Sequence, residues 1–292
     1  MKKAVFITGP TSSGKSELAV YLAKKFNGEV INADSRQVYK FLDYGSGKVT
    51  SKEMKGINHH LFSIASPKKN YFLARWLKDA YKALNKIIKK RKLPIFCGGT
   101  ILYLKALKEG WILPSVKPDY RLRRKLEKLS KEELIEKIKE INPSALENID
   151  LNNKRRLIRR LEIIRQLGKI EPIKKNPQVN LLILAISLPW EELEKRIKER
   201  LEKRIPFIIK EIKKLRKIGL SFKRIISFGL EYEWFGKFVL GEISLKEATE
   251  GCLKETRKFA KKQIRELKKI NEVTWIKEKI EAEEKIDKFL LT

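Results

Sequence analysis

The feature that most constrains this chain lies near its amino terminus, where a strand-like apolar run leads into a glycine-bearing loop and then a helical pattern. The loop residues are Gly9, Pro10, Thr11, Ser12, Ser13, Gly14, Lys15 and Ser16. Glycines allow backbone N–H groups to surround a phosphate, and a helix start adds the positive end of its dipole. We therefore predict a phosphate-binding loop for a di- or triphosphate, with Lys15 on the outer phosphate and the Ser16 hydroxyl on a magnesium ion.

Composition is typical of a globular protein, but the charge is not. Of the 292 residues 42% are hydrophobic, which is enough to form a core, while 67 basic residues face 36 acidic ones and leave a net charge of +31. Adaptation to heat enriches both signs of charge in near balance, so it does not explain this excess. A polyanionic partner explains it better, and nucleic acid is the first candidate.

Other global features predict a cytoplasmic protein that does not engage a membrane, and we expect it to be a monomer. The first strand begins within the first few residues, which predicts no signal peptide, and no uninterrupted apolar run is long enough to cross a membrane. Cys97 and Cys252 are far apart in the chain, so we expect no disulfide framework. His59 and His60 are adjacent and lack a third ligand, so we expect a structural or substrate-positioning role rather than a zinc site.

The order of apolar runs predicts an α/β fold with a mainly parallel sheet flanked by helices, of the P-loop NTPase-like type. Beyond the first apolar run, strands are expected at residues 29–33, 93–97, 181–186 and 273–276, and helices at 72–90, 190–217 and 277–291. From about Pro114 the chain becomes highly charged and helical, and the strand pattern then resumes. We therefore predict a catalytic core formed by residues 1–113 and 183–292, interrupted by an all-helical insertion domain at residues 114–182.

Polar residues follow two of the predicted strands. Asp34 lies at the end of one strand, at the edge where a parallel sheet binds its ligands. A carboxylate there could be a metal ligand, a general base or a helix N-cap, and the sequence alone does not choose among them. Gly98, Gly99 and Thr100 follow another strand, where a phosphate-loop NTPase commonly has an acidic magnesium ligand. These glycines indicate backbone that lies close to a ligand, with a hydroxyl nearby.

The insertion contains a helix with one strongly basic face. Spacings of three and four residues place on this face Arg155, Arg156, Arg159 and Arg160, and the opposite side contains Leu157, Ile158 and Leu161. Such a stripe fits a phosphodiester backbone better than a general solvated face. Two more basic segments follow at residues 195–224 and 254–269, and Arg196 and Arg200 lie one turn apart in the first of them.

Several short stretches, in the same order over nearly the whole chain, together resemble a known family. They are Gly9 to Ser16, Asp34 to Tyr39, Gly98 to Thr100 with Leu102 and Tyr103, Arg156 with Arg159, Leu161 and Glu162, Arg196 and Ile197 with Arg200, and Thr256 and Arg257 with Ala260, Lys261 and Gln263. Each stretch alone is weak evidence for a family, but the whole set in this order is specific for one. It resembles the tRNA dimethylallyltransferases, also called tRNA isopentenyltransferases.

The resemblance implies transfer of a dimethylallyl group from dimethylallyl diphosphate to N6 of adenine 37, next to the anticodon of tRNA. The phosphate loop would hold the diphosphate of the donor, with Mg²⁺ as cofactor. The basic insertion and helices would bind the anticodon stem-loop. Because the target amine lies within a stacked loop, the adenine would have to swing out into a pocket.

Roles for individual residues also follow from the resemblance. Asp34 would be the general base that accepts the N6 proton. Thr100 would hydrogen-bond the bridging oxygen of the diphosphate, and Arg200, Lys15 and the magnesium on Ser16 would neutralise its charge as it leaves. The tRNA contacts implied by the resemblance are Asp34, Ser35, Arg36, Gln37, Arg123, Arg155, Arg156, Leu157, Ile158 and Arg159.

The chain departs from the family pattern in places. Val49 follows Lys48 where a proline is usual, Asn153 replaces an aspartate, and Ile264-Arg265 replaces Thr-Trp. Residues 228–232 read Phe-Gly-Leu-Glu-Tyr instead of Ile-Gly-Tyr-Lys-Glu. These differences concern the fine RNA contacts rather than the donor site.

Two other functions fit parts of the sequence. A small-molecule or nucleotide kinase would explain residues 9–16, but neither the basic insertion nor the glycines at the end of strand 93–97. A non-catalytic RNA-binding protein that uses a nucleotide as a switch would explain the charge, but it would leave Asp34 and Thr100 without a role.

Overall fold

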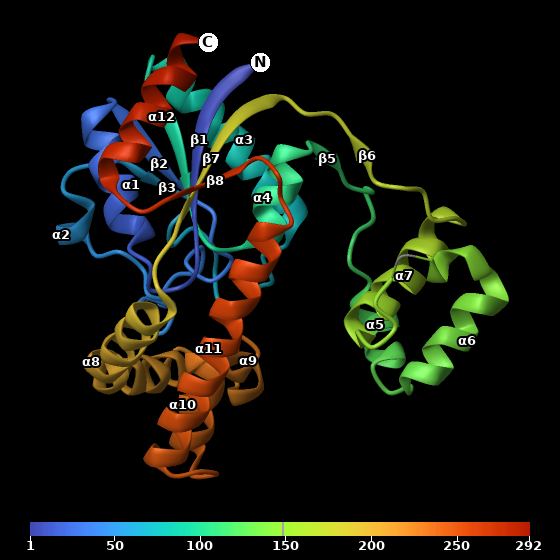
Figure 1. Ribbon diagram of the computed structural model, residues 1–292. Coiled ribbons are helices and arrows are strands. Elements are labelled where there is room, and N and C mark those ends of the chain that lie inside the picture. Colours follow the sequence, from blue (N-terminus) through green and yellow to red (C-terminus); the bar gives the residue numbers. More distant parts are fainter. Residues whose placement is uncertain (148) are drawn as a thin grey trace. The chain divides into compact units, whose positions relative to one another are not determined.

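A fully parallel six-stranded sheet forms the centre of the larger of two units in the computed structural model, which describes residues 1–147 and 149–292 (Figure 1). This unit comprises Met1–Glu109 and Pro177–Thr292. Its strands are β1 (Lys2–Thr8), β2 (Gly28–Asn32), β3 (His59–His60), β4 (Leu93–Cys97), β7 (Val179–Ile186) and β8 (Val273–Ile276). Their order in the sheet is β3-β2-β4-β1-β7-β8, so the predicted parallel α/β sheet is confirmed.

Strand β1 lies in the middle of the sheet and is apolar because both of its faces are covered. It pairs with β4, where Val5 lies opposite Ile95, and with β7 over its whole length. Parallel strands that are buried on both faces have continuous rather than alternating apolar residues. Because all strands point the same way, the segments that follow β1, β2 and β4 emerge at one edge of the sheet.

Helices cover both faces of the sheet (Figure 1). On one face, α1 (Lys15–Lys25) and α12 (Lys279–Leu291) pack with the β1 side chains of Val5 and Ile7 into one buried cluster. On the other face lie α3 (Leu73–Lys89) and α4 (Ile101–Lys108). Trp76 of α3 stacks on Tyr103 of α4 with 4.1 Å between ring centroids, and it also lies against Phe96 of β4.

Four further helices gather beyond the carboxyl edge of the sheet (Figure 1). They are α8 (Trp190–Lys217), α9 (Phe222–Ile226), α10 (Glu231–Leu240) and α11 (Leu245–Lys268), and α10 packs against the other three. A short helix, α2 (Ser51–Met54), lies in the segment between β2 and β3. No helix in the described part of the chain is long and apolar enough to cross a membrane.

The paired histidines belong to the outermost strand, β3. Nε2 of His60 lies 2.7 Å from Oε2 of Glu29, a β2 residue that is only 1% exposed. Lys90 and Lys92 also pair with the Glu29 carboxylate. Burial by itself would raise the pKa of Glu29, but these hydrogen bonds outweigh it and lower the pKa to about 2. His60 therefore has a structural role at the sheet edge.

The second unit, described here by itself, comprises Gly110–Asn176. Its helices are α5 (Tyr120–Leu126), α6 (Lys131–Ile141), the 3-10 turn η1 (Pro143–Leu146) and α7 (Lys154–Leu167). They enclose a small apolar core in which Leu134 and Ile138 of α6 meet Leu157, Ile158 and Leu161 of α7. Capping is local: Ser130 and Glu133 form a capping box at α6, and the Asn153 side chain accepts a hydrogen bond from Arg156 N at α7.

The insertion begins and ends earlier than the sequence predicted, and it is not purely helical. Strands β5 (Trp111–Ile112) and β6 (Lys174–Lys175) form an antiparallel ladder, and the amide of Asn176 donates to the carbonyl of Gly110. Composition identifies where helical residues begin, but it cannot reveal a two-residue pairing between distant segments. At the other boundary, β7 already begins at Val179 because that residue pairs in register with Lys2 of β1.

A buried carboxylate organises the insertion. Glu162 of α7 is 0% exposed, and its Oε1 accepts hydrogen bonds from Asp119 N at 2.6 Å and Arg123 Nε at 2.9 Å. Its Oε2 pairs with Arg123 Nη2 and Arg159 Nη1. Burial alone would raise the pKa of Glu162, but these hydrogen bonds outweigh it and lower the pKa.

We predict that Glu162→Gln destabilises the insertion by about 3 kcal/mol, because it leaves two partly buried guanidinium groups without a charged partner. Hydrogen exchange of the α7 amides should accelerate strongly. Glu136→Gln is the matched control, since Glu136 pairs with Lys139 at an exposed position, where such a pair contributes about 1 kcal/mol or less. Equal exchange rates in the two variants would show that Glu162 does not organise the unit.

Candidate active site

The phosphate loop lies between β1 and α1 and has an unusual backbone. Gly9, Ser12 and Gly14 have φ angles of 136°, 63° and 90°. A Cβ atom on Gly9 would lie 3.2 Å from the backbone of Ile186 in β7, so this position has no room for a side chain. Nζ of Lys15 turns back over the loop and donates to the carbonyl of Pro10 at 2.6 Å.

Two hydroxyl groups at the loop are buried and have no partner among the described residues: Thr8 Oγ1 and Ser13 Oγ. Ser13 Oγ would lie 3.1 Å from a Cβ on Gly9, which places this hydroxyl inside the curve of the loop. Buried polar groups are nearly always paired in folded proteins, so an unpaired hydroxyl here indicates a missing acceptor. A phosphate oxygen would be such an acceptor.

The ammonium group of Lys15 has a strongly perturbed environment. Burial, with the nearby Arg200 charge in the same direction, lowers the pKa of Lys15 to about 8, although Cys97 and Asp34 oppose the shift. Lys15 and Arg200 both contact residues of the phosphate loop, and the charges of Arg200 and Asp34 act on Lys15, although the three residues come from α1, α8 and the segment after β2. An anion beside Lys15 would stabilise the charged form of the lysine.

Asp34 shapes the turn that follows β2. Its Oδ1 accepts hydrogen bonds from Arg36 N at 2.8 Å and Gln37 N at 3.3 Å. Asn32 fixes the residue from the other side, because its side chain bonds both the amide and the carbonyl of Asp34. Among the described residues no group donates to Oδ2 of Asp34. One carboxylate oxygen therefore caps the turn, and the other is available for chemistry.

The glycines after β4 serve a close approach within the protein. A Cβ on Gly98 would lie 2.2 Å from the carbonyl carbon of Ala33, and one on Gly99 would lie 2.3 Å from Nε2 of Gln263. Packing inside the protein is therefore enough to require glycine at both positions, and backbone close to a ligand stays a prediction. Thr100 follows, and its Oγ1 accepts a hydrogen bond from Ser35 N at 3.0 Å, which joins the segments after β4 and β2.

Gln263 of α11 is a residue to which sequence reasoning assigned no role. It is 3% exposed, its Oε1 accepts from Thr11 N at 2.8 Å, and its Nε2 donates to the carbonyl of Gly99 at 2.9 Å. The side chain thus links the phosphate loop to the segment after β4. In the sequence, the only signal for Gln263 was its place in the ordered set of stretches that resemble the family.

Arg200 reaches the loop from α8. Its Nη1 donates to Thr11 Oγ1 at 3.4 Å and to Ser12 Oγ at 3.3 Å, and its Nη2 donates to the carbonyl of Gly47 at 3.4 Å. Burial, and next the neighbouring Arg204, lowers the pKa of Arg200. None of these long contacts is to a carboxylate, so the guanidinium remains available to an anion in the loop.

The loop that contains Gly47 is held by a second buried carboxylate, on α8. Glu211 accepts hydrogen bonds from the amides of Asp43, Tyr44 and Gly45 at 2.7, 2.8 and 3.1 Å. Oη of Tyr232 donates to the same carboxylate at 2.6 Å. Tyr232, at the end of the 228–232 segment, therefore supports the donor side of the site, which corrects our expectation that this departure from the family pattern concerns only the RNA contacts.

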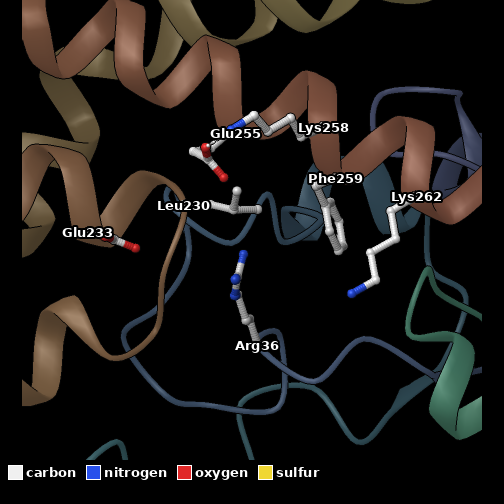
Figure 2. Close-up of a pocket in the computed structure, with 7 residues that line it drawn as sticks. All are labelled: Arg36, Leu230, Glu233, Glu255, Lys258, Phe259 and Lys262. Atoms are coloured by element: carbon white, nitrogen blue, oxygen red, sulfur yellow. Dashed lines mark hydrogen bonds and ion pairs between the residues drawn. The ribbon is translucent and has the colours of Figure 1, made fainter. Parts of the chain in front are cut away.

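A pocket of about 280 Å³ lies beside the Asp34 turn (Figure 2). Its lining residues come from that turn, from the start of α10 and from α11, and they are Arg36, Leu230, Glu233, Glu255, Lys258, Phe259 and Lys262. Figure 2 shows Arg36 extending toward Leu230, with Phe259 and Lys262 of α11 on the adjoining wall. An aromatic ring between cationic side chains fits a nucleobase and its phosphate.

The predicted tRNA-binding residues of the insertion fall into three groups. Arg155 and Arg156 are exposed. Leu157 and Ile158 are 0% and 6% exposed, so their side chains hold α7 on its core and present no surface to RNA. Arg123 and Arg159 are engaged by Glu162, as described above. Arg123, Arg155, Arg156 and Arg159 stay predictions as RNA contacts.

The site's architecture defines a class: an α/β core with a phosphate loop, interrupted by a mainly helical insertion. Comparison with known proteins agrees. The sequence profile of the IPP transferase family matches residues 37–269. The tRNA dimethylallyltransferase of Acetivibrio thermocellus is 38% identical over 99% of this chain and 96% of its own length. That of Thermomicrobium roseum is 35% identical over 94% of this chain and 86% of its own.

Solved structures of proteins with the same kind of name are also similar to this chain. The full-length tRNA isopentenylpyrophosphate transferase of Bacillus halodurans is 32% identical and superposes with a TM-score of 0.71, covering 95% of this chain and 90% of that one. A eukaryotic dimethylallyltransferase acting on tRNA is 26% identical, with a TM-score of 0.78 over 95% of this chain and 74% of its own. The chain belongs to the IPP transferase family.

We predict that pyrophosphate binding weakens as the pH rises through about 8. The free Lys15 loses its proton in this range, and an anion binds the charged form, so binding must be accompanied by proton uptake. Isothermal titration calorimetry in buffers of different ionisation enthalpy measures that uptake. Lys15→Arg is the control, because its guanidinium stays charged and any remaining pH dependence belongs to the ligand. The same pH profile in both proteins would contradict the assignment.

Proposed function

We propose that this protein transfers the dimethylallyl group of dimethylallyl diphosphate to N6 of adenine 37 in tRNA and releases diphosphate. In the reaction the allylic C–O bond breaks, an N–C bond forms, and N6 loses one proton. The observation that carries the proposal is the convergence of Lys15, Arg200 and Asp34 at the phosphate loop. Its relatives support it, since they are named tRNA dimethylallyltransferases.

The donor side of the site fits a diphosphate leaving group. As the C–O bond breaks, negative charge grows on the bridging oxygen, and Lys15 and Arg200 would stabilise it. The Thr100 hydroxyl already accepts a hydrogen bond from Ser35 N, so its own proton is free to be donated to that oxygen. Stabilisation that increases in the transition state is what raises the rate.

A magnesium ion fits the same place. Among residues 1–147 and 149–292 there is no group of three or more His, Cys, Asp or Glu side chains that could hold a metal ion alone. Mg²⁺ commonly takes one or two protein ligands and obtains the rest from water and phosphate oxygens. Ser16, in the first turn of α1, would supply the protein ligand, and the ion would supply further charge neutralisation to the diphosphate.

The acceptor side depends on Asp34 and the neighbouring pocket. The exocyclic amine of adenine is a weak nucleophile, so positioning and proton removal both matter. Oδ2 of Asp34 is available as the proton acceptor, while Oδ1 keeps the carboxylate in place through the turn. Arg36 extends from that turn into the pocket with Phe259, which gives the flipped base and its neighbours a binding surface.

The direct test is incubation with radiolabelled dimethylallyl diphosphate, Mg²⁺ and unmodified tRNA that has adenine at position 37. Label should enter the RNA and should be lost when that adenine is replaced by guanine. Hydrolysis of ATP, or phosphate transfer to a small molecule, without label in the RNA would favour a kinase. Tight RNA binding with neither activity would favour a nucleotide-dependent switch.

We predict that Asp34→Asn lowers the rate of transfer at least a hundredfold while tRNA affinity changes little. The amide can still accept the turn hydrogen bonds through its oxygen, but it cannot take the N6 proton. Single-turnover rates and filter binding measure the two quantities separately. Loss of tRNA binding with normal turnover of the bound tRNA would contradict the role of general base.

We predict that Arg156→Ala weakens tRNA binding and reduces the slope of log affinity against log salt by about one, because one phosphate contact is lost. Transfer from saturating tRNA should be nearly unchanged. Lys139→Ala is a suitable control, since Lys139 is paired with Glu136 on α6. An unchanged salt slope in Arg156→Ala would remove this residue from the RNA-binding surface.

A further inference from the structure

We propose that Arg204 is a second guanidinium that binds the diphosphate of the donor, beside Arg200. No role was assigned to this residue by the sequence motifs. The assignment rests on the proposed function, because it concerns the same donor site. It follows from three observations: the groove that Arg204 lines, the unpaired Nη2 of its guanidinium, and the approach of both Arg200 and Arg204 to Gly47.

The groove runs along α8 over the phosphate loop and has a volume of about 360 Å³. Its lining residues are Ser12 of the loop and Arg196, Glu199, Arg200, Lys203 and Arg204 of α8. Residues 196, 200 and 204 are each four apart, so they lie on one face of the helix. The groove therefore combines a phosphate-loop hydroxyl with a row of cations, and its one carboxylate cannot neutralise all of them.

Among the described residues nothing accepts a hydrogen bond from one nitrogen of the half-buried Arg204 guanidinium. Its Nη2 is buried and makes no hydrogen bond to any described residue. Arg196, in contrast, is paired with Glu192, and Lys203 is exposed to water. A buried charged donor that lacks an acceptor is strongly destabilising, so such a group is retained where a ligand supplies the acceptor.

The two guanidinium groups converge on the same backbone. A Cβ on Gly47 would lie 1.8 Å from Nη2 of Arg200 and 3.3 Å from Nη1 of Arg204, so the absence of a side chain at Gly47 leaves room for both. Two like charges this close repel each other, and burial strengthens the repulsion. A ligand with several negative charges would relieve it.

A diphosphate fits this arrangement better than a phosphodiester of RNA. Arg200 already contacts Thr11 and Ser12 within the phosphate loop, and Arg204 lies one helical turn further along the same groove. Two adjacent phosphoryl groups can bridge the two guanidinium groups, whereas a single phosphodiester carries one charge. Guanidinium groups form charge-assisted, often bidentate bonds with phosphate oxygens.

The test measures the binding of inorganic pyrophosphate to the full chain by calorimetry in the presence of Mg²⁺. Arg204→Met removes the guanidinium but keeps an unbranched apolar side chain, and we expect the affinity to fall about tenfold. Lys213→Met is the matched control at an exposed position of α8 that does not line the groove, and its affinity should stay within about twofold. Arg204→Lys keeps the positive charge but lacks the guanidinium group that can form two parallel hydrogen bonds. Its pyrophosphate affinity should lie between those of the wild type and Arg204→Met.

Each result has a defined meaning. Unchanged pyrophosphate affinity in a folded Arg204→Met protein, checked by its circular dichroism and Tm, would overturn the assignment. A drop in tRNA affinity alone would overturn it too and place Arg204 on the RNA. Dimethylallyl transfer by the wild-type protein is measured in parallel: if transfer occurs and the Arg204→Met affinity is unchanged, only this inference fails, whereas no transfer in wild type refutes the proposed function itself.

Discussion

The burial of positive charge next to the phosphate loop is the constraint on which the rest of this site depends. Lys15 and Arg200 are both held where burial lowers their pKa, so each is less stable as a cation than it would be in water. A bound anion would compensate for that loss. The site is therefore matched to an anion.

Keeping those cations in place requires support from distant parts of the chain. Gln263 of α11 fastens the phosphate loop to the segment after β4, and Glu211 of α8 fastens the loop that contains Gly47. Thr100 and the Asp34 turn are joined through Ser35. Each link uses a hydrogen bond from a part of the chain far away in sequence, so the geometry of the site is a property of the folded unit.

The insertion separates its basic residues by function. Glu162 engages Arg123 and Arg159 inside the unit, where they contribute to stability. Arg155 and Arg156 of the same helix remain exposed and available to a polyanion. A charge count treats all four arginines alike, because it does not show which of them lie beside the buried Glu162 carboxylate.

Much of this protein was determined by sequence alone. The predicted helix 190–217 and the predicted strands at 93–97 and 273–276 have the observed bounds, because continuous apolar runs and helical spacing are local properties. The phosphate loop, Asp34 and Thr100 were likewise found from local motifs. Only tertiary structure decided that Gly98 and Gly99 accommodate Ala33 and Gln263, that Tyr232 supports Glu211, and that Nη2 of Arg204 is buried without a partner among the described residues. These are contacts between segments far apart in the chain, and no local pattern encodes which of them will meet.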